Sequence, residues 1–428
     1  MPQQPHAFGR ELRRRRLAAN ISLEQLGALV HYSKGQLSKV ERGLKPATST
    51  LARLCDEQLK ADGALAALAP AETAEVGSTH SLHDGEVWLM QLGQDGANTF
   101  HTVNRRSLLS AGAASLLSFS SVNVNISVDT GAATLVDASR SLFREFRRMG
   151  QTTAPGTLLP SLIAQTHSLR QMAAHNGSRT RRDLLVLASR YAEYAGWMAQ
   201  ESGNDEAALW WTKQAAELAA AGGDHDLAIY GLARRALISL LRGDSAEAVE
   251  LAGRALDSDA APRVRGLAAQ KLAQAHAVAG NYDACMRSLD RARELLAEDS
   301  GDSTQPVIGA SHLPDVVSMF TGWCLQELGR PDQAAETLGA QTARLPDHAL
   351  RSRSRYGVRQ ALAHATAGDI DQACSVARSL LGSVAVVHSA TITADLHRLA
   401  RTLRRHPRVN AVRELDPELS ALLASTAV

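Results

Sequence analysis

The sequence predicts an all-α fold in two parts, a small N-terminal bundle of crossed helices and a larger C-terminal stack of helical hairpins. Aromatic residues make up only 4% of the 428-residue chain, while Ala, Leu and Arg are abundant. That composition favours helices over sheets. Apolar residues recur at helical spacing near the N-terminus, and glycine-containing turns recur at intervals of 37 to 49 residues after position 200. A chain of this length accommodates two or three domains.

Residues 22–43 carry the most specific local pattern, two short helices separated by a tight turn. Ser22 can cap the first helix, and a glutamine three residues later completes a capping box. Leucine or valine at positions 23, 26 and 30 then forms one apolar face. His31 and Tyr32 break this pattern, Ser33 is the next N-cap, and Gly43 ends the second helix.

Two amphipathic helices flank this unit, at residues 8–19 and 48–59. The first carries the basic run 13–16, and the second presents leucines at positions 51, 54 and 59. The inward positions of all four helices predict one small hydrophobic core. Its expected members are Phe8, Leu12, Leu26, Leu37, Val40, Leu51 and Leu54.

The outward side chains of this unit suit the major groove of DNA. Lysine and glutamine can read purine edges, serine can contact bases or phosphate, and Arg42 and Lys45 would position the domain on the backbone. Residues 1–60 hold eleven Lys and Arg against five Asp and Glu, a net charge of +6; the whole chain is +2, so the remainder carries −4. The alternative is a solvated charged helix pair, but this asymmetry favours DNA. The predicted DNA-contacting residues are Gln25, Ser33, Lys34, Gln36, Ser38, Lys39, Arg42 and Lys45.

Leu23-Glu24-Gln25-Leu26 and the run from Leu37 to Gly43 resemble the Xre/phage-repressor type of helix-turn-helix domain. The resemblance covers about residues 8–60. It implies a double-stranded DNA operator read by Lys34, Gln36 and Lys39. Gly27 stands where this family usually has alanine, and we expect it to loosen the first helix slightly.

Several classes of site are not indicated by the sequence. The four cysteines, Cys55, Cys285, Cys324 and Cys374, sit singly in helical patterns without a CxxC pair, as reduced buried thiols of a cytoplasmic protein would. No apolar run is long enough to predict a membrane span or a secretory signal. We find no metal-ligand spacing, phosphate loop, nucleophile elbow or dinucleotide fingerprint, and therefore expect no cofactor and no enzymatic activity.

Residues 70–131 read as a linker between an N-terminal domain at 1–69 and a repeat domain at 132–428. Val87–Leu92 and Thr99–Val103 are predicted to pair as a short β-hairpin. Residues 104–112, which include Arg105 and Arg106, resemble a twin-arginine export signal. Because a complete DNA-binding unit precedes it, we favour a connector helix with a basic cap and leucines at 108, 109, 116 and 117.

The C-terminal part contains a repeated pattern of helix, tight turn and helix. A small residue stands seven positions before and five positions after each turn glycine. Antiparallel helices need small side chains where their axes approach, and each hairpin leaves an apolar face for the next one to cover. The turns are Gly203-Asn204, Gly243-Asp244, Gly280-Asn281, Gly329-Arg330 and Gly368-Asp369.

These offsets resemble the tetratricopeptide repeat, although the units exceed its 34-residue length. A third small position, twelve after the glycine, is kept in the first three copies and replaced by Gln341 and Leu380 in the last two. We expect an opening hairpin from helices at 134–149 and 156–175, and closing helices near 388–404 and 415–425.

By the same resemblance, the first helix of each hairpin lines a concave surface. Amides, arginines and aromatic rings there would suit a peptide or a small signal molecule. The alternative is that these side chains, Trp197 and Trp323 above all, pack between repeats. The predicted ligand-binding residues are Arg190, Glu193, Trp197, Gln200, Tyr230, Gln270, Gln274, Trp323, Gln326 and Arg355.

The fusion of these two domains resembles the bacterial peptide-sensing regulators of quorum circuits. It implies a homodimeric transcriptional regulator whose repeat domain senses a ligand and changes operator binding. The alternative function is a tetratricopeptide interaction scaffold for a protein partner, in which DNA binding is secondary.

Overall fold

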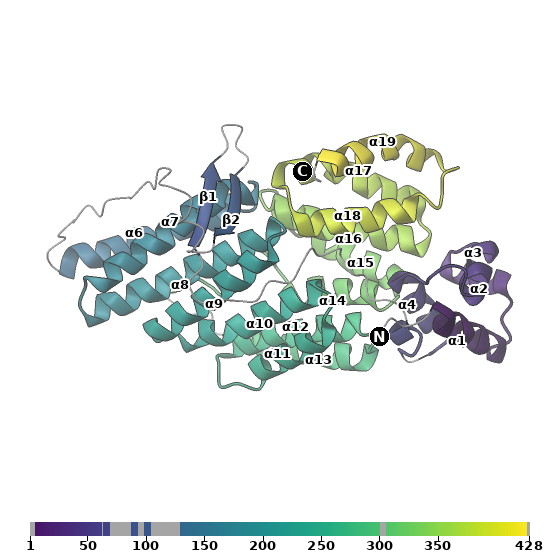
Figure 1. Ribbon diagram of the computed structural model, residues 1–428, viewed down its shortest axis with the longest axis horizontal. Coiled ribbons are helices and arrows are strands. Elements are labelled where there is room, and N and C mark those ends of the chain that lie inside the picture. The colour runs from purple at the N-terminus through teal and green to yellow at the C-terminus, as the bar shows by residue number, and fades with distance from the viewer. Residues whose placement is uncertain are drawn as a thin grey trace.

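The structure is a computed structural model that describes residues 5–61, 63–68, 87–92, 98–103, 129–299 and 305–425. It is helical throughout apart from one two-stranded hairpin, which confirms the predicted fold class. An N-terminal bundle lies beside one end of a long array of paired helices (Figure 1).

The N-terminal bundle has the four expected helices, followed by a 3-10 turn at Ala66–Leu68. All seven predicted core residues are buried together. The first helix of the helix-turn-helix begins with the capping box predicted at Ser22. The predicted N-cap Ser33 also forms a capping box, with Gln36, and His31 adopts the left-handed conformation between the two helices. The helices are α1 (Pro5–Ala18), α2 (Leu23–Val30), α3 (Lys34–Glu41) and α4 (Ser49–Gln58).

Gly27 has a steric role that differs from the expected loosening of α2. A Cβ atom at this position would lie 2.5 Å from the carbonyl oxygen of Tyr32, which is closer than real contacts allow. The turn between α2 and α3 therefore folds back onto α2 at a distance that only glycine permits.

The predicted hairpin is confirmed in the linker region. Strand β1 (Val87–Leu92) pairs antiparallel with β2 (Asn98–Val103), with Val87 opposite Val103. The second strand begins one residue earlier than expected. The motif at 104–112 and the proposed connector helix lie outside the described residues.

The repeat domain is a row of antiparallel helix pairs. The two helices expected to open the domain are α6 (Asp129–Met149) and α7 (Pro155–Ala174), but α7 packs mainly on α8 and not on α6, so they do not form the expected hairpin. The helices expected to close the domain are α18 (Ala390–Leu403) and α19 (Asn410–Ser425), which begins five residues before the expected start. Between them lie α8 (Ser178–Glu201), α9 (Asp205–Gly222), α10 (His225–Leu241), α11 (Ser245–Leu256), α12 (Pro262–Val278), α13 (Tyr282–Ala297), α14 (Val316–Glu327), α15 (Pro331–Thr342), α16 (Leu350–Ala367) and α17 (Ile370–Val387).

All five predicted turns join the two helices of a pair, and each turn glycine has a φ between +80° and +89°. The small positions are buried where the helices cross. A Cβ atom on Gly322 would lie 2.7 Å from the Leu338 side chain of the partner helix, and Ala208 and Ala334 are fully buried. The repeat geometry expected from the offsets is therefore present.

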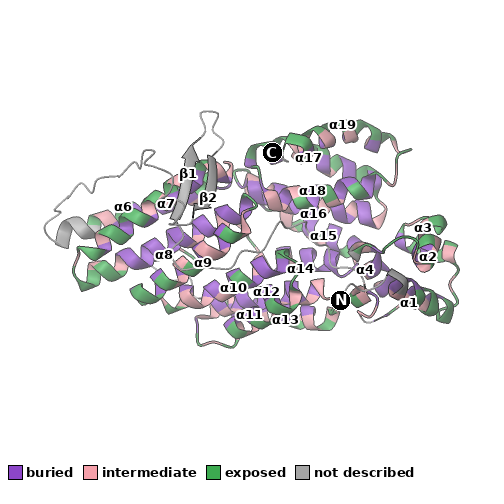
Figure 2. Cartoon of the chain, viewed as in Figure 1, coloured by how far each residue is buried: buried purple, intermediate pink, exposed green. Residues whose placement is uncertain are grey.

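Hydrophobic packing runs from each pair to the next. One cluster joins α6 to α10, a second joins α10 to α14, and a third joins α16 to α19. Figure 2 shows the buried residues concentrated on α8, α10 and α12, which lie inside the row. Helix α17 is long and apolar enough by composition to cross a membrane, yet its buried side chains belong to the third cluster.

A buried ion cluster ties the first repeats to the last ones. Arg351, on α16, is only 1% exposed and pairs with Glu201, at the end of α8, at 3.1 Å. Its guanidinium also donates to the carbonyl oxygens of Gly150, Thr153 and Val387. The guanidinium thus donates four hydrogen bonds to groups from three separate segments, which no hydrophobic contact could replace with the same geometry.

Substitution of Arg351 by methionine should destabilise the protein by about 3–5 kcal/mol, because it removes one partner of a buried charge pair and three carbonyl hydrogen bonds. Thermal unfolding measures the effect. Arg353→Met is the matched control, since Arg353 lies on the same helix and pairs with the fully exposed Asp347; it should change stability by less than about 1 kcal/mol. Equal melting temperatures for the two variants would contradict the role of Arg351.

Candidate functional site

The exposed face of α3 is basic. Lys34, Lys39, Arg42 and Lys45 are exposed, whereas Gln36 and Ser38 are half-buried. The opposite side of α3 is anchored by Glu41, which pairs with Arg16 of α1 at 2.7 Å in a largely buried contact. The lysines are consequently presented to solvent on a helix that is held from behind.

Three of the predicted DNA-contacting residues belong to the capping boxes of α2 and α3. Gln25 and Gln36 accept hydrogen bonds from the backbone N–H groups of Ser22 and Ser33, and the Ser33 hydroxyl accepts from the N–H of Gln36. A bidentate reading of adenine uses both the oxygen and the nitrogen of a glutamine amide. Gln36 would have to release Ser33 to read a base in that way, so Lys34 and Lys39 are the stronger candidates.

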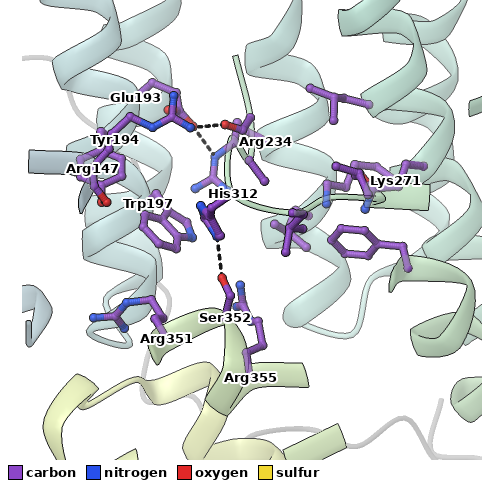
Figure 3. A pocket seen from close by; sticks show the side chains of 18 of the residues that line it. Arg147, Glu193, Tyr194, Trp197, Arg234, Lys271, His312, Arg351, Ser352 and Arg355 are labelled. Carbon is purple, nitrogen blue, oxygen red and sulfur yellow. Dashed lines mark hydrogen bonds and ion pairs between the residues drawn. The ribbon is translucent and has the colours of Figure 1, made fainter. Parts of the chain in front are cut away.

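A cavity of about 140 Å³ lies on the inner side of the repeat array. It has aromatic walls and a group of cationic side chains that converge from several helices (Figure 3). Five of the predicted ligand-binding residues line it. They are Glu193, Trp197, Tyr230, Gln270 and Arg355.

A second and larger cavity, of about 710 Å³, continues toward the N-terminal bundle. Gln200, Gln274 and Trp323 line this cavity, and Arg355 lines both. Lys271, which the sequence analysis did not select, also lines both cavities. The two spaces therefore share walls along the inner surface of the array.

Two predicted ligand-binding residues line neither of these two cavities. Arg190 is buried and pairs with Asp224 at 2.7 Å, next to the turn before α10. Gln326 is buried and donates to the Thr366 hydroxyl at 3.3 Å. Both side chains contribute to packing between neighbouring pairs, which was the alternative left open for every member of the predicted set.

Five of the cavity residues that were not predicted share one offset. The position nine residues before each turn glycine faces inward in all five repeats, whereas the predicted residues lie thirteen, ten, six or three positions before a turn glycine. Together with positions thirteen and six before the glycine, it forms the i, i+4, i+7 stripe of a helix face. The residues at this offset are Tyr194, Arg234, Lys271, Phe320 and Arg359.

An extended segment at 305–315 crosses the mouth of the first cavity. It accounts for the longest spacing between turns, and its residues 309, 310, 312 and 313 line the cavity. Arg147 donates to the carbonyl oxygens of residues 307 and 309, and Arg263 donates to those of residues 308 and 310. Ile308 is buried against the cluster that includes Tyr230. The inner surface thus holds a stretch of peptide backbone by four consecutive carbonyl groups.

His312 links this segment to α16. Its Nε2 atom lies 2.5 Å from the Ser352 hydroxyl. Burial lowers the pKa of His312 to about 4, with Arg147 adding to the shift. The ring is therefore neutral at physiological pH, and it adds no charge to the cationic wall.

The N-terminal bundle contacts the repeat array at the turns of the later repeats. The turn glycine Gly280 lies close to the Ala66 side chain, and Gly329 packs on the backbone of Arg53. Arg330 pairs with Glu57 at 3.0 Å, and Arg405 lies over the ring of Tyr32 at 4.2 Å from its centroid. Helix α3 takes no part in these contacts.

Glu327, at the end of α14, is the centre of this interface. Its carboxylate pairs with Arg53 of the N-terminal bundle, with Arg398 at 2.6 Å and with Arg359 at 3.3 Å. Burial alone would raise the pKa of this carboxyl, but Arg398, Arg53 and Arg359 outweigh it and hold the pKa well below its ordinary value. Arg359 also lies over the ring of Trp323, on the wall of the second cavity.

Comparison with known proteins agrees with the N-terminal assignment. Residues 7–69 match the family described as a helix-turn-helix domain. No curated relative matches the chain. Among solved structures, one titled "Crystal Structure of Rap Protein Complexed with Competence and Sporulation Factor" is similar, with 13% sequence identity and a TM-score of 0.41, over 70% of this chain and 99% of that chain.

Lys271 should make stability depend on pH in a defined window. Burial lowers its pKa from 10.5 to about 7, and the charges of Arg234 and Arg355 add to the shift, with an opposite contribution from Cys324. Between pH 7 and 10.5 the unfolded chain binds the additional proton, so stability rises with pH in that window.

Lys271→Met should therefore be more stable than the native protein below the lower pKa, and the difference should shrink at higher pH. Melting temperatures at about pH 6.5 and about pH 9.5 measure it. Lys213→Met, at an exposed position on α9, is the control and should show no such trend. A difference for Lys271→Met that stays constant with pH would contradict the burial of an ammonium group at this site.

Proposed function

We propose that the protein is a DNA-binding transcriptional regulator whose repeat domain binds a ligand, a peptide or a small signal molecule, and thereby changes operator binding. The observation that carries the proposal is the joint arrangement of the two parts: a helix-turn-helix domain with an exposed basic face is docked, through Arg53 and Glu327, onto the wall of an inner cavity. The proposal assigns no cofactor and no enzymatic step.

DNA binding is supported by the face of α3 and by charge. Lys34 and Lys39 are exposed on the second helix of the helix-turn-helix, the one that enters the major groove in such domains. The net charge of +6 on residues 1–60 gives the domain an electrostatic attraction for phosphate, whereas the rest of the chain is acidic. The protein would act in the cytoplasm, where its DNA target lies.

Dimer formation is part of the proposal. One recognition helix reads only a few base pairs, and regulators of this kind reach useful specificity by binding two half-sites about one helical turn apart. The docking contacts leave α3 outward, so two copies could present their helices to one operator.

Ligand binding is supported by the inner surface of the array. The cavity combines aromatic walls with a few converging polar groups, which is typical of ligand sites. The segment at 305–315 supports a peptide-like occupant, because Arg147 and Arg263 hold its backbone carbonyls as they could hold those of a peptide in trans.

In this proposal, Glu327 couples the ligand cavity to the helix-turn-helix domain. Arg359 touches this carboxylate on one side and the ring of Trp323, a cavity wall, on the other. A ligand that shifts α14 or α16 would change the geometry of the group that holds Arg53. Control of DNA binding requires that the ligand bind the two arrangements with different affinity.

Lys39→Ala should weaken operator binding by about fivefold or more, since a lost base or phosphate contact costs about 1–3 kcal/mol. The operator is first selected from genomic fragments with the full-length protein, and affinity is measured by mobility shift. Lys213→Ala, which removes an exposed lysine far from α3, is the control and should bind as the native protein does.

Unchanged affinity for Lys39→Ala would remove that residue from the interface. Failure to select any operator, combined with recovery of one stoichiometric protein partner, would instead favour the alternative function as an interaction scaffold.

A further inference from the structure

Lys271 is a buried cation without a carboxylate partner. Lys271 is only 8% exposed. Its Nζ atom donates a hydrogen bond to the Gln274 side-chain oxygen at 3.0 Å and lies 4.7 Å from the centroid of the Phe320 ring. In the described part of the chain, no carboxylate oxygen lies within ion-pair distance of it. An amide and an aromatic ring compensate a buried ammonium only in part.

The other charges around Lys271 increase this deficit. Arg147, Arg234, Arg351 and Arg355 line the same cavity, whereas Glu193 is the one acidic residue among its lining side chains. The charges of Arg234 and Arg355 both act against a proton on Lys271. The cavity therefore carries a surplus of positive charge that its own side chains do not neutralise.

Three of the four arginines in the wall have a carboxylate partner, which separates them from Lys271. Arg351 and Arg355 both pair with the buried Glu201. Arg234 lies 3.4 Å from Glu193 and donates to Gln200. Arg147 donates instead to the carbonyl oxygens of residues 307 and 309. Lys271 has neither kind of partner in the described part of the chain, and it lies next to the apolar part of the wall (Figure 3).

We propose that this cavity binds a ligand that carries a carboxylate beside an apolar group, and that the carboxylate pairs with Lys271. The apolar group would contact the rings of Trp197, Tyr230, Phe320 and Tyr356, which line the same space. The inference rests on the proposed function, because it names the chemical class of ligand that the repeat domain would sense.

Size and charge both favour a monoanion of modest volume. Cavities of about 150 Å³ hold a benzene ring, so the volume of about 140 Å³ fits an aromatic or branched acid, or the last residue of a peptide. A phosphate group usually takes several donors, from arginines or a helix N-terminus. Here three of the neighbouring arginines already pair with carboxylates of the protein, and a single carboxylate matches the ammonium of Lys271, which has no such partner.

The test compares matched probes on the full-length protein. Thermal shift and titration calorimetry are run with benzoate and with benzamide, which have the same ring but differ in charge. We expect benzoate at millimolar concentration to raise the melting temperature and to bind at least about tenfold more tightly than benzamide, as expected for a charge-assisted contact. N-acetyl-phenylalanine and its C-terminal amide, as a second pair, distinguish a peptide carboxylate from a small free acid.

Lys271→Met and Lys271→Gln should both lose the preference for benzoate, while Lys213→Met should keep it. Two neutral replacements are used so that a packing defect in one of them is recognised by the other. No carboxylate-specific stabilisation of the native protein, or an equal preference in both Lys271 variants, would overturn the proposal.

Failure of this proposal can be distinguished from failure of the proposed function. If culture extract changes operator binding of the native protein and of Lys271→Met to the same extent, ligand sensing stands and the carboxylate assignment falls. If extract changes the native protein alone, and the carboxylate probes compete with it, both are supported.

Discussion

The carboxylate of Glu327 is the contact on which the arrangement of the two domains depends. It is almost completely buried, so its charge requires compensation, and three guanidinium groups provide it. Two of these, on Arg359 and Arg398, belong to the repeat array, and the third, on Arg53, belongs to the helix-turn-helix domain. The helix-turn-helix domain therefore supplies part of the positive charge that neutralises a carboxylate buried in the array. Removing this domain would leave Glu327 with fewer cationic partners.

This constraint explains why docking at the repeat turns is compatible with a sensing role. The same cluster reaches Trp323 through Arg359, and the cavity wall continues from there to Lys271. The peripheral contacts, Arg330 with Glu57 and Arg405 over Tyr32, are more exposed and contribute less. A small shift of the helices around the cavity would therefore strain the ion pairs of Glu327. Because these buried pairs have few alternative arrangements, the cluster meets the physical requirement for a two-state response.

Local features could be predicted from the sequence, and long-range polar ones could not. The capping boxes at Ser22 and Ser33, the core of the N-terminal bundle and the five glycine turns follow from patterns within a few residues. The pairs Arg351–Glu201 and Arg53–Glu327 join residues 150 and 274 positions apart, and no local pattern marks them. The inner surface of the array was predicted only in part, because the residues chosen lie thirteen, ten, six or three positions before a turn glycine, whereas Lys271 lies nine before one. The sequence predicted that Gly27 would loosen α2. Its actual role is to allow the backbone of Tyr32 to approach the helix closely, and helix propensity contains no information about such a contact.

The central claim is that the ion pair between Arg53 and Glu327 holds the helix-turn-helix domain on the repeat array. Hydrogen exchange of the full-length protein tests this claim most directly. Arg53→Met is compared with Arg42→Met, a control that removes an exposed arginine of the same helix-turn-helix domain. Arg53→Met leaves Glu327 two of its arginines, so the array should remain folded. We predict faster exchange at the turns around 278–281 and 327–330 in Arg53→Met alone, with α8 and α9 unchanged. Equal protection of these turns in both variants would contradict the account.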